Sequence, residues 1–424
     1  SGESIIQPII NIDKKLLLFN GEIYNPKDEN RADTLLLMDN LSKNSIESFL
    51  KNCRGEFAIC TYDIKNKTIK IYRDLIGTKP LFYGFSEDKF VVSSYKAPLE
   101  YLGLENISEV KPNIIISIDI NDFANPLIES KALFSLNLEQ NVDNLVSWEK
   151  NFLRSVEERA NHFKTKLCVP LSAGYDSGAI CCALNLLNIS YESVTVGDAE
   201  NIEVLKKRTK INLEKSCKKH HKIKPLDKKE YKNLQNYIIK KVGEISYSHI
   251  DGDRKKPIFL HEDCGAIGLA KLCEVMNKKG FNTILSGSGA DEIISDYGFG
   301  GNKLFSHSEF GGYFPDKLES IFPWKKFYGD SQKSYLRKDE MISGLYGMEG
   351  RYPFLDADLI QSFLNITTEL KNQRYKNCIA TFLEKNNYPF EAVKKDGFYP
   401  LKSKLNFIEK LLLKMRDKIL FYKA

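Results

Sequence analysis

Cysteine usage in this chain excludes a disulfide framework and a structural zinc site. There are nine cysteines, an odd number, with no Cys-x-x-Cys pair and no cluster of cysteine with histidine. Cys181 and Cys182 are adjacent in the sequence and cannot both contribute to one simple disulfide or metal site. Scattered thiols of this kind are typical of a reducing compartment, so we expect free, mostly buried cysteines and a cytoplasmic location.

Long apolar runs and concentrated charge are also missing. Apolar runs such as the one ending at Phe19 are far shorter than the ~20 residues that span a membrane. The residues Ser1 to Ser4 carry neither a basic start nor an apolar stretch, so no export signal is expected. The net charge of +6 is spread widely, and the basic runs at 206–208 and 218–221 are typical of solvated helix faces. No nucleic-acid surface is predicted; an anionic substrate or nucleotide accounts for the mild positive excess.

Length and composition indicate a globular protein of more than one domain. With 424 residues, 42% hydrophobic and 28% charged, the chain is long enough for two or three cores. Residues 14 to about 120 contain short strand patterns broken by turns, with helical patterns at about 33–41 and 45–52 between them. This succession predicts an α+β layered domain.

The pattern changes after Phe134. Residues 144–163 have apolar positions at helical spacing, and short apolar runs then alternate with helical stretches. The runs, which we interpret as buried parallel strands, lie at 167–171, 191–196 and 283–285. Alternation of this kind predicts a doubly wound parallel sheet, followed by a helical region from about 335. We therefore expect two domains, residues 1–135 and 136–424.

The strongest local signal is a loop of small and polar residues between the strand at 167–171 and a helix at 178–187. It consists of Ser172, Ala173, Gly174, Tyr175, Asp176 and Ser177. Small residues let backbone N–H groups approach an anion, and the following helix N-terminus supplies further donors. We predict that this loop binds the pyrophosphate of ATP, together with the flanking Leu171 and with Val196 on the next strand. An ordinary helix cap is the alternative.

A second loop repeats this arrangement after the strand at 283–285. It reads Ser286-Gly287-Ser288-Gly289-Ala290-Asp291-Glu292. Two such loops at the carboxyl edge of a parallel sheet can hold one triphosphate, with Ser286 and Gly287 on the phosphates. A carboxylate faces phosphate only across a cation, so we predict that Mg²⁺ lies between Asp176 and Asp291. A flexible turn is the alternative for the second loop taken alone.

Four ordered blocks resemble the asparagine synthetase family, over nearly the whole chain. The first loop resembles the Ser-Gly-Gly-x-Asp-Ser pyrophosphate loop of N-type ATP pyrophosphatases, with Ala173 in place of one glycine. The second matches the family's Ser-Gly-x-Gly-x-Asp-Glu. Residues 349–356 match its Glu-x-Arg-x-Pro-Phe-Leu-Asp block, and 395–401 match a Lys-x-Gly-Phe-x-x-Pro-Leu-like stretch. The resemblance implies a doubly wound ATP pyrophosphatase domain with a helical C-terminal part, after a truncated layered domain of the N-terminal-nucleophile hydrolase type. It also implies ATP and Mg²⁺ as cofactors.

The N-terminal region is similar to the family's glutaminase domain but lacks its nucleophile. By this resemblance Asn20, Gly21 and Glu22 belong to the glutamine pocket, and Asp33 belongs to the segment that holds the glutamine α-amino group. A glutaminase of this class needs a cysteine at the mature N-terminus, whereas this chain starts with Ser1. We therefore expect no glutamine hydrolysis and a vestigial pocket. A pocket completed from elsewhere is the alternative.

The synthetase blocks also depart from the family at one position. Where Ser288 stands, the resemblance implies a catalytic glutamate in asparagine synthetases and a tyrosine in β-lactam synthetases. Glu349 is the candidate base for the attacking amine, or else a structural partner of a basic group. Lys395 is similar to the family lysine that stabilises charge on the adenylate and pyrophosphate. Arg351 and Asp356 are expected to hold their block in place.

The predicted reaction has two steps. A carboxylate attacks the α-phosphate of ATP to give an acyl-adenylate and pyrophosphate, and an amine then takes the acyl group. The leading hypothesis is a natural-product ligase or cyclase acting on a small-molecule or peptide substrate, similar to β-lactam synthetases and lasso-peptide cyclases. The alternatives are asparagine synthetase-like amidation with ammonia or glutamine, a non-catalytic nucleotide-binding homologue, and sulfur or ammonia transfer onto tRNA. No nucleic-acid or membrane partner is expected, and a homodimer is left open.

The polar segment 243–275 is the hypothesised acyl-substrate pocket. A surface loop followed by the start of a helix is the alternative.

Overall fold

The computed structural model describes residues 5–25, 31–86, 89–123, 125–162, 165–197, 201–247, 258–304, 307–391 and 400. The chain divides into two compact units. Unit 1 consists of Ser1–Asn141, Lys150–Thr165 and Arg351–Asn365, and unit 2 of Val142–Glu149, Lys166–Gly350 and Ile366–Ala424. Among the described residues, no helix has both the length and the apolar composition needed to cross a bilayer.

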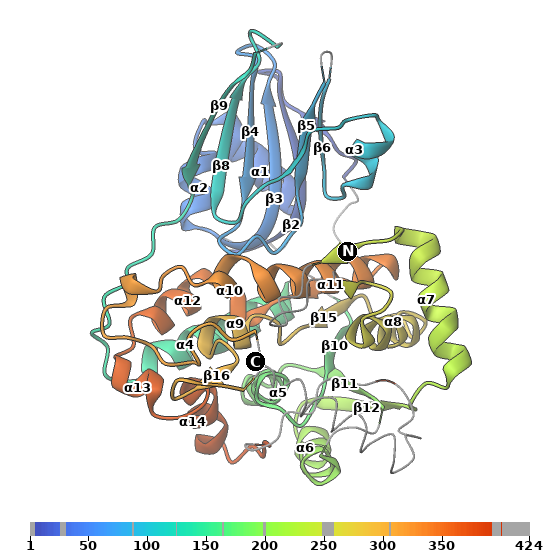
Figure 1. The fold of residues 1–424 in the computed structure, drawn as a ribbon, viewed down its shortest axis with the longest axis vertical. Helices are drawn as coiled ribbons and strands as arrows, with labels where there is room; N and C mark the ends of the chain where they lie inside the picture. The colour runs from blue at the N-terminus through green and yellow to red at the C-terminus, as the bar shows by residue number, and fades with distance from the viewer. Residues whose placement is uncertain are drawn as a thin grey trace, which may run out of the picture. The chain divides into compact units, whose positions relative to one another are not determined.

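Unit 1 contains two antiparallel sheets, a larger one in the strand order β1-β2-β3-β4-β8-β9 and a smaller one in the order β6-β5-β7 (Figure 1). The strands are β1 (Ile9–Ile10), β2 (Lys15–Asn25), β3 (Arg54–Asp63), β4 (Thr68–Arg73), β5 (Phe82–Phe85), β6 (Phe90–Ser93), β7 (Ile107–Glu109), β8 (Ile114–Asp119) and β9 (Leu127–Ala132). The helices are α1 (Asp33–Ser42), α2 (Ile46–Asn52), α3 (Ala97–Tyr101), most of α4 (Val146–Asn161), η2 (Pro353–Leu355) and α12 (Ala357–Leu364).

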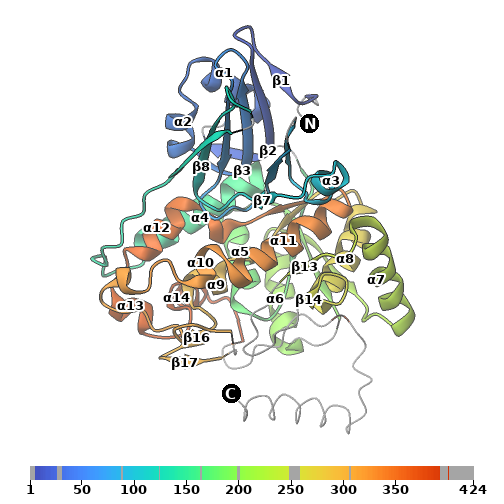
Figure 2. The same cartoon turned by 45° about the horizontal axis from the view of Figure 1, so that its top comes forward.

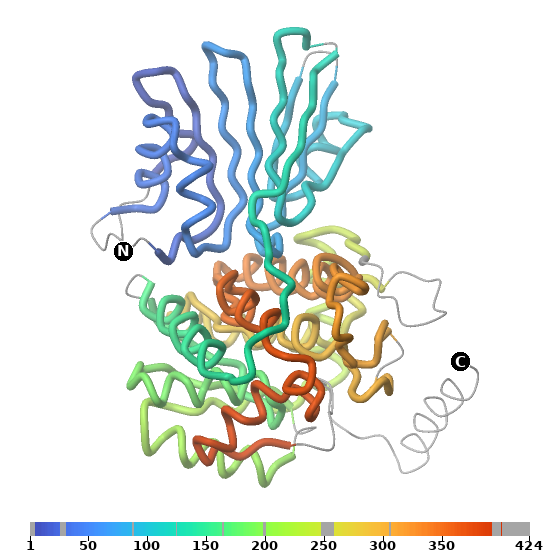
Figure 3. The backbone as a smooth tube through the Cα atoms, turned by 90° about the vertical axis from the view of Figure 1, so that its left-hand side faces the viewer, coloured from blue at the N-terminus to red at the C-terminus, as the bar shows by residue number. Residues whose placement is uncertain are grey.

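The alternation of side chains along β3 explains the layering of unit 1. Phe57 and Ile59 belong to a core shared with α1 and α2. Ala58 and Cys60, which point to the other face of the strand, belong to a core shared with β5 and β6. The larger sheet therefore has helices on one face and the smaller sheet on the other, an arrangement that can be followed in Figure 3. The predicted α+β layered domain is confirmed.

A buried ion-pair network fixes α4 and the segment after β18 within unit 1. Arg159 donates from Nε to Glu56 Oε1 at 2.7 Å and from Nη1 to Asp356 Oδ2 at 3.3 Å, and all three side chains are 1% exposed. Arg351 Nη1 donates to the backbone oxygens of Arg159 and His162 at 2.6 and 2.9 Å. Arg351 and Asp356 therefore hold their block in place, as the sequence predicted. Removing one partner of such a network typically costs about 3–5 kcal/mol.

Unit 2 is built on a five-stranded sheet in the order β12-β11-β10-β15-β18, and parallel pairings join β12, β11, β10 and β15. Its strands are β10 (Leu167–Pro170), β11 (Tyr191–Val196), β12 (Cys217–Ile223), β13 (Ser246–Tyr247), β14 (Ile258–Phe259), β15 (Thr283–Leu285), β16 (Gly298–Phe299), β17 (Asn302–Lys303) and β18 (Glu349–Arg351). Its helices are α5 (Tyr175–Leu186), α6 (Ile202–Glu214), α7 (Lys228–Val242), α8 (Cys264–Asn277), α9 (Ala290–Ile294), η1 (Leu318–Ser320), α10 (Lys325–Tyr328), α11 (Asp330–Leu345), α13 (Thr368–Asn372) and α14 (Asn377–Lys385). The predicted doubly wound parallel sheet is confirmed.

The core of unit 2 forms where strand side chains meet three helices. Val194 and Val196 of β11 lie in one cluster with Ile238 of α7, Ala270 of α8 and Ile342 of α11. Figure 2 shows α7 and α8 side by side. Helix α5 is buried along almost its whole length and contacts α6 and α14. Helices therefore pack against the parallel strands, as expected for a sheet whose strands are apolar on both faces.

The two basic runs have only in part the environment that the sequence predicted. Residues 218–221 form part of β12, a strand at the edge of the sheet, so the expected helix face is wrong there. Residues 206–208 lie on α6 as expected, but Arg208 is 0% exposed. Lys206 and Lys207 are exposed on α6, so the solvated helix face is confirmed for that part of the run, whereas tertiary contacts remove Arg208 from solvent.

Candidate active site

Two loops leave the carboxyl ends of β10 and β15, which are parallel neighbours in the sheet. From β10 the chain builds β11 and β12 on one side, whereas the later strands β15 and β18 lie on the other side. The strand order therefore reverses between β10 and β15, and sheets of this type bind ligands at such a reversal. The loops are closely packed, since a Cβ added to Gly287 would lie 3.0 Å from Asp176 Cβ.

The first loop is held in shape by two hydroxyl groups. The backbone N–H of Ser172 donates to Ser177 Oγ at 3.0 Å, and the two hydroxyl oxygens are 2.8 Å apart. The N–H of Gly174 donates to Ser172 Oγ at 3.2 Å, and Gly174 caps helix α5, which begins at Tyr175. Ala173 is buried, and its carbonyl oxygen accepts the N–H of Glu391 at 3.0 Å. The loop thus has a defined shape at the N-terminus of a twelve-residue helix.

Leu171 and Val196, also predicted to contact ATP, are both buried. Leu171 follows β10, and its N–H donates to the backbone oxygen of Val194 at 2.8 Å. Val196 ends β11, and its side chain is part of the core described above. Their contact with ATP stays a prediction.

Arg208 supports the first loop through hydrogen bonds to backbone oxygens. Its Nη1 donates to the backbone oxygen of Ser172 at 2.5 Å, and its Nε donates to that of Pro389 at 2.6 Å. A Cβ on Gly178 would lie 2.3 Å from the Arg208 guanidinium, so α5 can approach this group only because position 178 is glycine. The buried end of the basic run at 206–208 is therefore a structural support of the first loop.

The second loop is fixed by a partly buried carboxylate. Asp339 Oδ2, on α11, accepts the hydroxyls of Ser286 and Ser288 at 3.0 and 2.7 Å. Gly289 follows with φ of 96°, a left-handed conformation that favours glycine, and α9 begins directly after it. Burial raises the pKa of Asp339, although Lys338 and the two serine hydroxyls act in the opposite direction. This carboxylate therefore keeps its proton to a higher pH than an exposed one.

The carboxylates of the two loops meet at one buried lysine. Lys376 Nζ lies 2.6 Å from Asp176 Oδ1 and 2.7 Å from Asp291 Oδ1, and the lysine side chain is 1% exposed. Tyr375 donates its hydroxyl to Asp291 Oδ1 at 2.9 Å. Burial by itself would lower the pKa of Lys376, but the two aspartates outweigh it and hold this pKa well above the usual value. The structure thus brings Asp176 and Asp291 together around a single positive charge.

Of the other predicted synthetase residues, Glu349 lies on β18 and Lys395 lies outside the described residues. Glu349 begins β18, and its N–H donates to the backbone oxygen of Asn282 at 2.8 Å, just before β15. Ser288 follows the opposite end of β15, so the backbones of Glu349 and Ser288 flank different ends of this strand. Lys395 lies outside the described residues, as do residues 248–257 of the hypothesised substrate segment. The roles predicted for Glu349 and Lys395 stay predictions.

The residues of the predicted glutamine pocket lie together in unit 1. Asn20 donates from Nδ2 to Ser94 Oγ at 3.1 Å. Gly21 has φ of 142°, and a Cβ there would lie 1.9 Å from a carbonyl oxygen of β3, so this position requires glycine. Asp33 Oδ2 accepts the N–H of Ile23 at 2.7 Å. Glu22 and Asp33 both face His162 Nε2.

Sequence reasoning missed three residues of the synthetase cluster, Lys376, Asp339 and Arg208. None of them lies in a block that resembles the family or follows a predicted strand end. Lys376 is separated from Asp176 by 200 positions and Asp339 from Ser288 by 51. The only signal was the basic run that contains Arg208, and it favoured a solvated helix face. These contacts depend on tertiary packing, which local pattern does not encode.

Comparison with known proteins gives matches over most of the chain. The model of the family described as "Glutamine amidotransferase domain" matches residues 2–100. A putative glutamine-hydrolysing asparagine synthetase of Methanocaldococcus jannaschii is 25% identical over 407 residues, covering 88% of this chain and 68% of that protein. A probable asparagine synthetase of Acanthamoeba polyphaga mimivirus is 25% identical over 403 residues, covering 87% and 68%.

One solved structure that resembles the chain is the glutamine phosphoribosylpyrophosphate amidotransferase of B. subtilis, complexed with ADP and GMP. It is 13% identical, with a TM-score of 0.27 and coverage of 93% of this chain and 82% of that one. The sequence relatives match both the unit that carries the Asn20–Glu22 block and the unit that carries the two strand-end loops. The chain is therefore similar to asparagine synthetases over most of its length.

Proposed function

We propose that the chain is an ATP-dependent ligase that adenylylates a substrate carboxylate, releases pyrophosphate and passes the acyl group to an amine. The observation that carries the proposal is the convergence of Asp176 and Asp291, from two strand-end loops, on the single positive charge of Lys376. The names of the two relatives above, both asparagine synthetases, support an amide-forming ligase.

In this proposal the phosphates of ATP lie between the two loops. The backbone N–H groups of 172–177, at the start of α5, bind one part of the triphosphate, and Ser286 and Gly287 bind another. Lys376 turns its ammonium from the aspartates toward the departing pyrophosphate, because negative charge develops there as the α-phosphate is attacked. This is the role that the family resemblance gives to Lys395, so the site would have two lysines available for it.

The same two carboxylates suit Mg²⁺. Their Oδ1 atoms lie within 2.6 and 2.7 Å of one ammonium, so they already share a cation, and carboxylate oxygens are ligands that Mg²⁺ prefers. Asp176 and Asp291 would hold the ion, which when bound supplies positive charge to the triphosphate. The residues that are present therefore fit the predicted cofactor.

Ser288 and Asp339 provide a route for the proton that the amine must lose. The proton passes from the amine nitrogen to Ser288 Oγ, while the hydroxyl proton of Ser288 passes to Asp339 Oδ2, 2.7 Å away. The raised pKa of Asp339 makes it a better proton acceptor near neutral pH than an exposed carboxylate. A carboxylate from α11 would thus replace the glutamate that the resemblance implies at position 288. Glu349 is the alternative base.

The amine in the leading proposal belongs to a natural-product substrate, either the same molecule as the carboxylate or a second one. Two observations support it: position 288 is serine, and Asp33, the carboxylate implied for the glutamine α-amino group, lies 3.2 Å from His162 Nε2. Asparagine synthetase-like amidation is the second candidate, and the names of the relatives favour it.

Pyrophosphate release tests the reaction class. The chain is incubated with ATP, Mg²⁺ and a library of carboxylate–amine pairs that includes aspartate with ammonia or glutamine, and products are detected by intact mass. We expect AMP and pyrophosphate in equal amounts with one pair, and a loss of at least about 100-fold in D176N and D291N. The control variant E203Q removes an exposed carboxylate on α6 and should leave the rate unchanged. Release of ADP and phosphate, or equal rates in all variants, would refute adenylylation.

The base is identified with three further variants. If Asp339 accepts the proton, D339N and S288A lower kcat while the KM for ATP stays the same, and E349Q has little effect. The opposite result, with E349Q alone impaired, would assign the base to Glu349 and leave Asp339 as a structural residue.

A further inference from the structure

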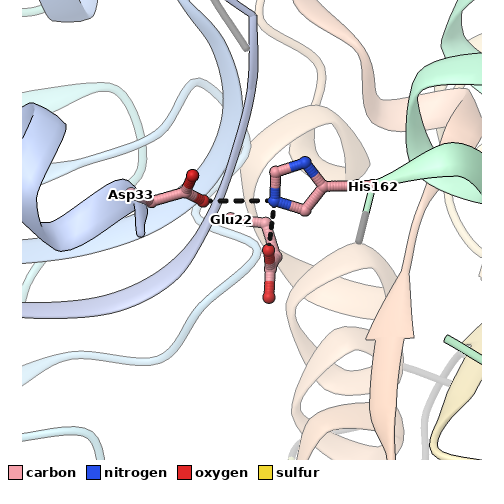
Figure 4. A group of neighbouring side chains, drawn as sticks. All are labelled: Glu22, Asp33 and His162. Carbon is pink, nitrogen blue, oxygen red and sulfur yellow. Dashed lines mark hydrogen bonds and ion pairs between the residues drawn. The ribbon is translucent and has the colours of Figure 1, made fainter. Parts of the chain in front are cut away.

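Three side chains from separate parts of unit 1 point their ligand atoms at one place. Glu22 comes from the middle of β2, Asp33 from the first turn of α1 and His162 from the residue after α4. One ligand atom from each lies within 4.8 Å of the other two. Figure 4 shows the imidazole Nε2 facing both carboxylates. The histidine side chain is 2% exposed, Glu22 15% and Asp33 11%, so the convergence is largely shielded from water.

The single nitrogen His162 Nε2 lies between two carboxylate oxygens. His162 Nε2 lies 3.2 Å from Asp33 Oδ2 in hydrogen-bond geometry and 2.5 Å from Glu22 Oε2. One ring nitrogen carries at most one hydrogen, so it can donate fully to only one of the two oxygens. Within the described part of the chain, Glu22 Oε2 is buried and has no hydrogen-bond partner besides its ion-pair contact with His162 Nε2. A shared cation would satisfy all three atoms at once, whereas a proton cannot.

The surroundings hold two of the three groups in position. Asp33 Oδ2 accepts the N–H of Ile23 at 2.7 Å, which fixes the carboxylate at the start of α1. The edge of the Tyr24 ring packs against the imidazole, with ring centroids 5.1 Å apart. Arg351 donates to the backbone oxygen of His162 at 2.9 Å and so anchors the histidine. Contacts of this kind orient metal ligands and are as important as the ligands themselves.

We propose that Glu22, Asp33 and His162 bind one divalent transition-metal ion, of the class to which Zn²⁺ belongs. Imidazole nitrogen favours Zn²⁺, Co²⁺ and Fe²⁺ over Mg²⁺ and Ca²⁺, and two carboxylates with a neutral imidazole balance a charge of +2. Metal–ligand bonds of about 2.0–2.2 Å place neighbouring ligand atoms roughly 3–3.5 Å apart, a range that includes the observed 3.2 Å between His162 and Asp33. The partly exposed Glu22 carboxylate, whose Oε2 lies 2.5 Å from His162 Nε2, needs to move by about 0.5–1 Å to reach this range. The proposal does not depend on the proposed ligase activity.

The test uses the full chain, stripped with EDTA and titrated with Zn²⁺, and then with Co²⁺ as a spectroscopic probe. We expect one equivalent of Zn²⁺ in calorimetry and visible Co²⁺ bands without the near-ultraviolet charge-transfer band of a thiolate ligand. The variants H162Q and D33N should weaken binding by about tenfold or more. E22Q is the mildest change, because Glu22 is partly exposed and glutamine keeps its shape, and it should weaken binding in a chain that folds normally.

A second histidine–carboxylate pair supplies the matched control. His221, in unit 2, forms its ion pair with a single carboxylate, since Nε2 lies 2.5 Å from Glu192 Oε2. The variant H221Q should leave the stoichiometry and affinity unchanged. The proposal is overturned if the wild-type chain binds no Zn²⁺ at a tenfold excess, or if H162Q, E22Q and H221Q bind it equally. In either case the three residues form only a charged histidine–carboxylate cluster.

Discussion

Replacing Lys376 with methionine tests whether the two strand-end loops depend on a shared positive charge. Methionine keeps most of the aliphatic length of lysine but leaves Asp176 and Asp291 facing each other without the ammonium that lies 2.6 and 2.7 Å from them. Removing one partner of a buried ion pair costs about 3–5 kcal/mol. The aspartates are 20% and 11% exposed, so water stabilises them in part and we expect the lower end, about 3 kcal/mol. For a unit of this size that corresponds to a fall in Tm of about 6–12 °C.

The matched control is an exposed lysine with similar distances. Lys385 lies 2.8 Å from Glu149 Oε1, but the two side chains are 61% and 24% exposed, so K385M should cost only about 0–1 kcal/mol. Both variants are measured by thermal unfolding followed by circular dichroism. Adding D176N to K376M should recover part of the loss, because it removes the charge that the lysine neutralised. Equal shifts for K376M and K385M would show that burial does not strengthen the lysine contact, and the reasoning about this cluster would fail.

Three further predictions follow from close contacts and burial. G287A places a Cβ 3.0 Å from Asp176 Cβ, so it should lower pyrophosphate release by about tenfold or more with a Tm within about 3 °C of wild type; unchanged release would separate this contact from function. G21A combines a φ of 142° with a Cβ 1.9 Å from a carbonyl oxygen and should lower stability by about 3 kcal/mol or more, whereas G103A, with φ of 79° and nothing within 4 Å, should cost about 1–2 kcal/mol. Of the nine cysteines only Cys264 is partly exposed, so native protein should show one fast-reacting thiol that C264S removes; several fast thiols would contradict the structure.

Family resemblance and physical reasoning agree on the location of the synthetase site but differ on its residues. The resemblance implied Glu349 and Lys395, while the structure surrounds Ser288 and the two aspartates with Asp339 and Lys376. Serine at position 288 needs the carboxylate that lies 2.7 Å from it. A neutral hydroxyl is a weak base, so it can take a proton from the amine only if it passes its own proton to a neighbouring base. The variants described above decide between the two carboxylates.

The sequence alone determined the main strands and helices and the two loops that follow β10 and β15. Alternation of buried strands with helices predicted the parallel sheet, and the strands at 167–171 and 283–285 correspond to β10 (Leu167–Pro170) and β15 (Thr283–Leu285). Because parallel strands carry their carboxyl ends at one edge, the loops that follow them could be expected to meet, and Asp176 and Asp291 do converge. These predictions succeeded because they rest on periodicity and on rules for parallel sheets, both of which act over short stretches of chain.

Only the tertiary structure decided what the converging side chains contact. Lys376 reaches the aspartates from the start of α14, and His162 reaches Asp33 across 129 positions of sequence. The run 218–221 became a strand because β11 pairs with it, although its charges favoured a helix face. Such contacts depend on how distant elements pack and on which charges that packing removes from water. A buried lysine and an exposed lysine cannot be told apart in the sequence, and only burial distinguishes how much their ion pairs contribute to the free energy of unfolding.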